Sequence, residues 1–464
     1  MNTVEVLQRL DRETKAEVFL VGGFVRDYLR RKNNTDLDVV VRRLSFRNIR
    51  KFLTRHGRVK EVRLAKTNDS FEVNILLFRA SANDYEAQIT LPRRGKLQIP
   101  DSHNTLKQDV RFRDFKLNCL YLPINYKSRN DIVDLVGGRE DIVNRRITSN
   151  GSANERMKES PIRMLRAISL ASRTNYTIDE EIIEAITANS GLIKRCPWET
   201  IRDEFNQILM SKKPSKYLRL LRKTGLLKHI APEIDNCVGV KQDTRYHKYD
   251  VFTHLIYSVD HCDADLSIRL AALLHDTGKP ATRKENGSGT RHVSFHKHEM
   301  VSVKLARDLL KRLRYDTHTA RAVIGLVKNH MYHYTREWTD GAVRKFIRKV
   351  GLTPEYMSID KIGNFPLFRL RAGERLGNGL KGVAVTDRQK DFEKRIIDLY
   401  KESTGLTIQD LAINGTMLME TFRLPQGQKV GEILEFLLDQ IMERPSLNSR
   451  TELLKLAVEY LHEE

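Results

Sequence analysis

Cysteine is scarce in this chain. Four cysteines occur among 464 residues, they are widely separated, and no two of them form a CxxC pair. They are Cys119, Cys196, Cys237 and Cys262. Neither a disulfide framework nor a structural zinc site is therefore indicated, and we expect a reducing compartment.

Long apolar runs are also missing. No run approaches the length that a membrane-spanning helix needs, and the first residues, MNTVEVLQRLDRE, mix charges early and lack the apolar core of a signal peptide. The sequence thus predicts a soluble, cytoplasmic protein with no membrane partner.

Aromatic and acidic residues are few relative to basic ones. Aromatic residues make up 7%, and 81 lysines and arginines against 60 aspartates and glutamates leave a net charge of +21. Basic residues that only solvate helices would explain interspersed charge but not so large an excess. The excess indicates a polyanion, and a folded RNA bound through its backbone fits better than a single strand bound by base stacking.

The pattern of the chain changes near residue 131. Before it, short β-type segments alternate with helical ones, and after the turn-rich residues 150–154 nearly every segment has helical spacing. We expect strands at Val18–Val21, Leu37–Val41, Phe71–Phe78 and Asn118–Leu122. The sequence therefore predicts an α+β region followed by an all-α remainder.

The most informative stretch is residues 18–41, VFLVGGFVRDYLRRKNNTDLDVVV. Gly22 and Gly23 form an expected turn between the first strand and a helix that carries Arg26 and Asp27. Glycines let the backbone approach a phosphate closely, and a helix N-terminus offers free amides and partial positive charge to the same group. This half of the stretch predicts a phosphate site.

The other half carries two carboxylates. Asp36 and Asp38 fall on the next expected strand, where side chains two residues apart point to one face. They can hold a pair of magnesium ions that bridge the attacking and leaving oxygens of a nucleoside triphosphate reaction. Either half alone is weak evidence, but their close succession indicates phosphoryl transfer.

This stretch resembles the signature of the class II tRNA nucleotidyltransferase and bacterial poly(A) polymerase family, whose head belongs to the polymerase-β superfamily. Further along, DVRFRDFKLNCLY resembles the family's RRDFTxN motif. The resemblance implies that Arg113, Asp114 and Asn118 lie by the phosphates and sugar of the nucleotide. Phe112 stands where the first arginine of the motif is usual.

The segment ERMKESPIRMLRAISLASR predicts a helix that starts at Ser160 and Pro161, with the serine hydroxyl as cap. Arg163 and Arg166 then lie near the helix N-terminus, where cations are unfavourable unless they contact an anionic or polar group. The family has an EDxxR motif here that pairs with the base edges of CTP or ATP. The resemblance assigns this role to Arg163 and Arg166.

Three further positions depart from the family pattern. Ser160 replaces the aspartate, Ser169 replaces a further arginine, and Thr200 in WETIRDE stands where a related motif has arginine. A serine cannot supply a charged bidentate acceptor to an exocyclic amine. Whether the protein adds C, A or both therefore stays open.

Histidines gather in the second half of the chain. His254 falls on an apparent amphipathic helix, His275 and Asp276 close the apolar run IRLAALLHD, and His298 and His330 follow. A single histidine is usually a core or surface residue, but several imidazoles and a carboxylate can bind a divalent metal that activates water. This order resembles the HD phosphohydrolase domain found in many members of the same family.

The resemblance extends over nearly the whole chain. The family's last HD ligand is an aspartate, and its position falls on Glu374 here, whose extra methylene shifts the carboxylate. We expect a polymerase-β-like nucleotidyltransferase head at 1–148, an all-α neck at 149–235 that contacts base and RNA, an HD domain at 236–382 and a helical tail at 383–464.

These features predict a tRNA nucleotidyltransferase that adds C, A or both to the tRNA 3′ end from CTP and ATP, without a template and with release of pyrophosphate. Mg²⁺ would bind at Asp36 and Asp38, and a second divalent metal at the HD site. The implied partners are tRNA, CTP and ATP, and a homodimer is a family-level expectation. The alternatives are a poly(A) polymerase, an HD-type phosphohydrolase as the main activity and a non-catalytic RNA-binding protein.

Overall fold

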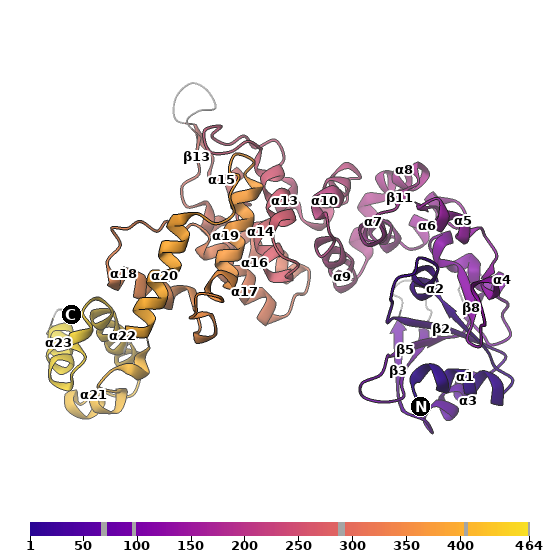
Figure 1. The fold of residues 1–464 in the computed structure, drawn as a ribbon, viewed down its shortest axis with the longest axis horizontal. Helices are drawn as coiled ribbons and strands as arrows, with labels where there is room; N and C mark the ends of the chain where they lie inside the picture. Colours follow the sequence, from indigo (N-terminus) through magenta and orange to yellow (C-terminus); the bar gives the residue numbers. More distant parts are fainter. Residues whose placement is uncertain (66–71, 95–98, 286–292, 403–406, 463–464) are drawn as a thin grey trace. The chain divides into compact units, whose positions relative to one another are not determined.

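The computed structural model describes the chain except for residues 66–71, 95–98, 286–292, 403–406 and 463–464. The chain forms two compact units, shown along the colour gradient of Figure 1. Unit 1 comprises Met1–Ile208 with Arg219–Ile230, and unit 2 comprises Leu209–Leu218 with Ala231–Glu464. The four-part division expected from the sequence stays a prediction.

Unit 1 is built on a seven-stranded sheet with the order β3-β4-β5-β2-β1-β8-β9. β2 and β5 run parallel, and the other neighbouring strands run antiparallel. The strands of this sheet are β1 (Glu17–Val21), β2 (Leu37–Arg42), β3 (Arg58–Ala65), β4 (Glu72–Arg79), β5 (Ala87–Thr90), β8 (Leu120–Pro123) and β9 (Val133–Asp134). Two short pairs are separate from it, β6 (Arg93–Arg94) with β7 (Ile99–Pro100), and β10 (Arg146–Ile147) with β11 (Thr177–Ile178).

Helices pack against part of this sheet and continue the chain beyond it. The α-helices up to residue 230 are α1 (Thr3–Glu13), α2 (Gly22–Leu29), α3 (Phe46–Leu53), α4 (Leu106–Asp109), α5 (Gly138–Val143), α6 (Ala153–Glu159), α7 (Ile162–Thr174), α8 (Glu180–Asn189), α9 (Trp198–Leu209), α10 (Pro214–Lys223) and α11 (Leu227–Ile230). Beyond β9, helices predominate, as the sequence predicts.

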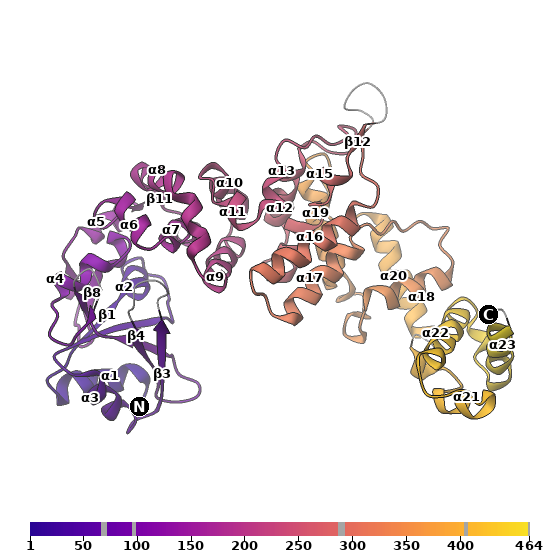
Figure 2. The ribbon, with the colours of Figure 1, turned by 180° about the vertical axis from the view of Figure 1, so that it is seen from behind.

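The two faces of the sheet are covered differently. α1 and α3 lie on one face (Figures 1 and 2), and Val25 of α2 is buried in the same core as their apolar residues. Leu37, Val39 and Val41 of β2 are buried in one core with the apolar residues of α1 and α3. Because side chains alternate along a strand, Asp38 points to the opposite face, beside Gly22 at the start of α2. The register of β2 thus keeps this carboxylate out of the main core.

The four expected strands are confirmed as β1, β2, β4 and β8, with shifted ends. β2 begins at Leu37, so Asp36 lies just before the strand, and Asn118 lies in the 3-10 helix η2 (Lys116–Asn118) ahead of β8. Residue 71, expected in β4, falls outside the described residues. β3, β5 and β9 were not expected, and β3 forms the edge of the sheet.

The expected Gly22-Gly23 turn is the first turn of α2. Gly22 has φ +66°, a backbone conformation that side chains with a Cβ rarely adopt. A Cβ at this position would lie 3.0 Å from the Asp38 Oδ2 atom. The glycine therefore lets the start of α2 lie directly against the carboxylate of β2.

The expected cap by the Ser160 hydroxyl is wrong. α7 begins at Ile162, its N-cap residue is Pro161, and no side-chain hydrogen bond caps it. Ser160 instead ends α6, where its N–H donates to the Arg156 carbonyl (3.2 Å) and its own carbonyl accepts from Arg163 N–H (3.0 Å). The Ser160 backbone therefore hydrogen-bonds with both helices, and Pro161 is the N-cap residue of α7 and not its first helical residue.

Unit 2 is helical apart from the short pair β12 (Lys284–Glu285) and β13 (Val293–Ser294). α13 packs against α14 and α19, and α14 packs against α17 (Figure 1). The α-helices after residue 230 are α12 (Pro232–Asp235), α13 (Val251–His261), α14 (Leu266–Leu274), α15 (Lys279–Thr282), α16 (His298–Arg312), α17 (Thr317–Asn329), α18 (Asp340–Val350), α19 (Pro366–Gly377), α20 (Asp387–Glu402), α21 (Gly415–Phe422), α22 (Gln428–Glu443) and α23 (Arg450–His462). Among the described residues, no helix has both the length and the apolar character needed to cross a membrane.

A buried aspartate anchors the loop that leads into β8. Asp109 is 1% exposed, and its Oδ2 accepts hydrogen bonds from Arg113 Nε (3.0 Å) and the Tyr121 hydroxyl (2.8 Å). Its Oδ1 accepts from the backbone N–H of Arg93 (3.0 Å). Burial by itself raises the pKa of Asp109, but the charges of Arg113 and Arg93 outweigh it and lower the pKa. The ionised carboxylate therefore stabilises the fold.

We expect Asp109→Asn to lower the free energy of unfolding of unit 1 by about 3 kcal/mol, because it leaves the Arg113 charge buried without its partner. Since the folded-state pKa of Asp109 is lowered, its contribution is present above the unfolded-state pKa of about 3.9 and is lost as the pH falls through the folded-state pKa. Hydrogen exchange of β1 and β8 peptides in the full chain, followed as a function of urea concentration, measures this free energy of unfolding. Glu13→Gln, at an exposed pair with Arg9, is the control. Equal protection in both variants would contradict the anchor.

Candidate active site and metal centre

Two carboxylates lie where β2 meets α2. Asp36 is exposed just before the strand, and Asp38 is partly buried within it. Burial raises the pKa of Asp38, and the negative charge of Asp36 raises it further, while Arg113 acts in the opposite direction. A carboxylate whose ionisation is disfavoured by burial and by a neighbouring carboxylate suits a bound divalent cation, which would reverse that effect. This donor set fits the hard metal expected here.

Arg26 of α2 is buried and held by two partners. Its Nε and Nη2 donate to the two oxygens of Asp27 (3.0 and 2.6 Å), and its Nη1 donates to Asn118 Oδ1 (2.9 Å). Asp27 also accepts from Arg30 Nη1 and Asn34 Nδ2. The structure thus brings Arg26, Asp27 and Asn118 together, and Asp27 orients the guanidinium next to Gly23.

Asp114 links the loop after α4 to helix α7. Its Oδ1 accepts from Arg163 Nε (2.6 Å), and its Oδ2 accepts from Arg166 Nη1 (3.0 Å). Burial by itself raises the pKa of Asp114, but the charges and hydrogen bonds of the two arginines outweigh it and lower the pKa. The two arginines expected at the base therefore share one carboxylate in this structure.

The two arginines differ in exposure. Arg163 is 3% exposed and also donates to the carbonyl of Phe112 (2.9 Å) and to Glu159 Oε2 (3.0 Å). The Arg166 side chain is 45% exposed, with its Nε 3.4 Å from Glu204 Oε1. Arg163 is thus a buried clamp between segments, and Arg166 is the arginine of this pair that solvent reaches.

Sequence reasoning missed the acidic partners of these arginines. Glu204 on α9 and Asp109 before the RRDFTxN-like motif each hold a predicted site arginine. Glu204 lies four residues after Thr200, so helical spacing offered a signal. Ser169 is fully buried in α7, which shows that this departure from the family motif faces the core.

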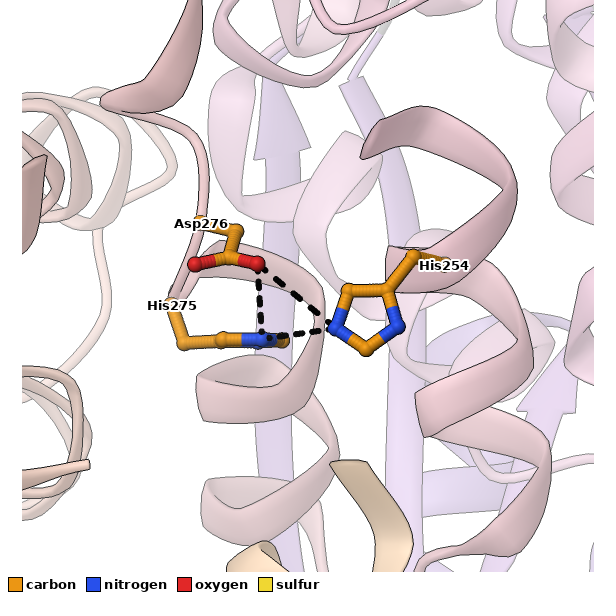
Figure 3. Close-up of side chains that lie close together, drawn as sticks. All are labelled: His254, His275 and Asp276. Atoms are coloured by element: carbon orange, nitrogen blue, oxygen red, sulfur yellow. Dashed lines mark hydrogen bonds and ion pairs between the residues drawn. The ribbon is translucent and has the colours of Figure 1, made fainter. Parts of the chain in front are cut away.

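A second cluster lies in unit 2 around Asp276. Figure 3 shows His254 of α13 meeting His275 and Asp276 at the end of α14. The Asp276 Oδ2 atom lies 3.6 Å from His254 Nε2 and 3.3 Å from His275 Nε2. Its Oδ1 atom lies 3.0 Å from His298 Nε2 and 3.7 Å from His330 Nε2. The four histidines named by the sequence pattern therefore converge on one buried carboxylate.

The ring orientations fit metal binding. Nδ1 of His275, His298 and His330 lies 2.7–2.9 Å from a backbone carbonyl three residues earlier. A carbonyl only accepts, so each Nδ1 donates its hydrogen to the carbonyl, and the Nε2 atom is the ring nitrogen directed at the cluster. In the part of the chain that the structure describes, the buried Nε2 atoms of His298 and His330 have no hydrogen-bond partner. These orphaned nitrogens suit a divalent metal.

Two further charged residues flank this cluster. Lys279, which sequence reasoning missed, places its Nζ 2.6 Å from Asp276 Oδ2 and 2.7 Å from Gln242 Oε1. Its position three residues after Asp276 was the available signal. Glu374, the predicted last ligand, accepts two hydrogen bonds from Arg371 Nη1 (3.0 and 3.2 Å) and belongs to neither metal-like group among the described residues. Its role as a ligand stays a prediction.

A cavity of about 600 Å³ opens beside Arg371. The aromatic ring of Tyr332 and the cationic side chains of Arg371, Arg375, Lys381 and Arg388 contribute to its lining. Burial raises the pKa of Glu374 while the charge of Arg371 lowers it, with a net pKa of about 2. The cavity is therefore cationic, and Arg371 in its wall pairs with Glu374.

Four protein families match successive parts of the chain. Residues 18–148 match the poly A polymerase head domain, and residues 175–238 match the RNA- and SrmB-binding site of polymerase A. Residues 246–398 match the HD domain, and residues 367–457 match domain 2 of tRNA nucleotidyltransferases. Head and HD domains of these kinds generally use divalent metals.

Curated relatives match across most of their length. The A-adding tRNA nucleotidyltransferase of Deinococcus radiodurans is 28% identical over 72% of this chain and 74% of the relative. The CC-adding tRNA nucleotidyltransferase of Thermus thermophilus is 26% identical over 92% of this chain and 90% of the relative. The multifunctional CCA protein of Cupriavidus metallidurans is 27% identical over 72% and 79%.

Solved structures agree in fold. The Bacillus stearothermophilus CCA-adding enzyme in complex with CTP superposes with a TM-score of 0.66 at 16% identity, over 99% of this chain and 96% of that one. A CCA-adding enzyme in complex with CTP has a TM-score of 0.53 at 19% identity, over 99% and 94%. The ordered family matches and the curated relatives show that the chain belongs to the class II tRNA nucleotidyltransferase and bacterial poly(A) polymerase family with an HD domain.

Proposed function

We propose that the protein is a tRNA nucleotidyltransferase that adds C, A or both to tRNA 3′ ends from CTP and ATP, with release of pyrophosphate. The observation that carries this proposal is the contact of Gly22, at the start of α2, with Asp38 beside Asp36. A helix N-terminus and a carboxylate pair then meet at one point, as transfer from a triphosphate requires. The names of the curated relatives support the substrate class.

Asp36 and Asp38 are the proposed ligands of Mg²⁺. When bound, the metal ions would activate the 3′-hydroxyl and neutralise charge on the triphosphate. Gly22 and Gly23 let the phosphates approach the α2 amides closely. Arg26, oriented by its bidentate pair with Asp27, and Arg113 are the proposed cations at the phosphates.

The base and the sugar are assigned to the other side of the site. We propose Asp114 and Asn118 near the sugar and Arg163 and Arg166 near the base, with Arg163 acting mainly by positioning Asp114. Ser160 cannot replace the carboxylate of the family motif, so base selection differs from that motif. Relatives named as A-adding, CC-adding and multifunctional CCA proteins have about the same sequence identity to this chain, so sequence identity does not indicate which nucleotides it adds. The cytoplasmic location and the homodimer stay predictions.

A second candidate activity is phosphohydrolysis in unit 2. The Nε2 atoms directed at Asp276 favour it, and so does the cationic cavity beside Glu374. A divalent metal bound there would supply an activated water. His254, His275, Asp276, His298 and His330 would hold the metal, and the arginines of the cavity would attract a phosphate ester.

Nucleotide transfer to the tRNA 3′ end should depend on Asp38. With Mg²⁺ and tRNA transcripts that end at the discriminator base, at C and at CC, we expect nucleotide addition resolvable at single-nucleotide resolution. Asp38→Asn should lower it by at least about a hundredfold, because even the partners that support a metal ligand contribute 10–100-fold. Asp276→Asn, in the other centre, is the matched control and should leave addition unchanged. Full addition by Asp38→Asn would refute the assignment.

The second prediction concerns the contact between glycine and carboxylate. Gly22→Ala should lower kcat about a hundredfold, because a Cβ displaces the Asp38 carboxylate. Gly137→Ala is the control, since Gly137 also has a positive φ but has open space where a Cβ would lie. Both variants carry the same backbone strain, so an equal loss of kcat would show that strain alone acts.

The third prediction concerns metal in unit 2. His330→Ala should reduce the divalent metal retained per chain, measured by mass spectrometry of the metal in an Asp36→Asn, Asp38→Asn background. His318→Ala, an exposed histidine of α17, should retain it. Hydrolysis of bis-p-nitrophenyl phosphate should follow the metal content. Equal retention in both variants would remove the support for this centre.

A further inference from the structure

The open part of the sheet in unit 1 continues the face that carries Asp38. Asp38 pairs with Gln88 of β5, Gln88 pairs with Leu77 of β4, and Leu77 pairs with Lys60 of β3. Residues paired directly across strands point to the same face. At a strand spacing of about 4.8 Å, Lys60 lies about 14 Å from Asp38 along this row.

This face is uncovered and cationic at its β3 end. Gln88, Lys60 and Arg58 are exposed, whereas the alternate residues Ala87 and Phe78 are buried against α1 and α3. A cavity of about 500 Å³ lies there, and its lining includes Arg58, Lys60, Arg79 and Glu86. The face therefore runs from the carboxylates into a basic hollow.

The basic side chains in this hollow lie close enough together to need a negatively charged partner. Arg58 lies directly opposite Arg79 across the β3–β4 ladder, and like charges in this position destabilise a sheet unless a counter-charge lies between them. Glu86 approaches Arg79 only to 3.6 Å, at an exposed pair. The buried Arg79 Nε has no hydrogen-bond partner among the described residues. These features indicate a missing anionic partner.

The position of the hollow identifies that partner. The glycines follow β1, and Arg26 and Arg113 donate to Asn118 and Tyr121 at β8, so in the strand order they lie on the side of β2 away from β5, where the nucleotide is proposed. An in-line transfer needs the attacking hydroxyl on the side of the metals opposite to the leaving pyrophosphate. The RNA end must then approach over β5, β4 and β3.

We propose that Arg58, Lys60 and Arg79 bind backbone phosphates of the last few nucleotides before the RNA 3′ end. This proposal rests on the proposed function for the identity of the RNA. Phosphate contacts of this kind position a strand without reading its sequence, which suits a substrate shared by all tRNAs. The hollow thus aligns the 3′-hydroxyl with Asp36 and Asp38.

The test is binding of labelled tRNA, without nucleotide, at several salt concentrations. For Arg58→Ala, Lys60→Ala we expect the slope of log affinity against log salt to fall by about 1.4, from two contacts to a single strand at about 0.7 each. The same relation gives a Kd raised about tenfold at 0.15 M salt. Anisotropy of a 5′-labelled transcript ending at CC measures both quantities.

The matched control is Arg47→Ala, Lys51→Ala. It removes one arginine and one lysine that are exposed on α3, on the opposite face of the sheet. We expect its slope and Kd to equal those of the wild type. An equal loss in both double variants would show a general charge effect and overturn the proposal.

A second arm locates the contact on the RNA. A tRNA that lacks the unpaired 3′ nucleotides should bind the wild type and Arg58→Ala, Lys60→Ala equally. A difference that persists with the shortened tRNA places the contact elsewhere and overturns the proposal, as does an unchanged Kd with the CC transcript. Binding is read without chemistry, so a wild type that binds but extends no tRNA would refute the proposed function alone.

Discussion

Asp114 accepts hydrogen bonds from Arg163 and Arg166, and this pairing joins the loop before β8 to helix α7. Removing either partner would leave a charge in a partly desolvated place, so the pair constrains both segments. Asp109 holds Arg113 and Asp27 holds Arg26 in the same way. Around Asp38, the arginines are therefore set in place before any nucleotide arrives, and less reorganisation accompanies the reaction.

The basic residues behind the net charge of +21 include two groups with different surroundings. Arginines at the proposed nucleotide site are paired with carboxylates, which orient them and reduce their free charge. Arg58 and Lys60, on the open face of β3, are exposed and can meet phosphates that neutralise them. A polyanion is thus attracted to the open face, while the site itself keeps fixed geometry.

The centre in unit 2 depends on the same pairing of buried charge with local geometry. Asp276 lies between Lys279 and four histidines. Backbone carbonyls three residues before His275, His298 and His330 set the orientation of these three rings. Ring orientation therefore comes from backbone that the helices already position. Glu374 instead pairs with Arg371 and belongs to neither metal-like group among the described residues.

Short-range pattern in the sequence determined the elements that carry the site: β1, the glycines, Asp36 and Asp38 at the start of β2, and the helices that carry the histidines. These depend on contacts between near neighbours, and so did the all-α remainder. Only the tertiary structure decided that Ser160 leaves α7 uncapped, that Asp109 anchors Arg113 through Tyr121, and that Lys60 shares a row with Asp38. Strand pairing joins residues far apart in the chain, and a slip of one residue would turn Lys60 to the other face.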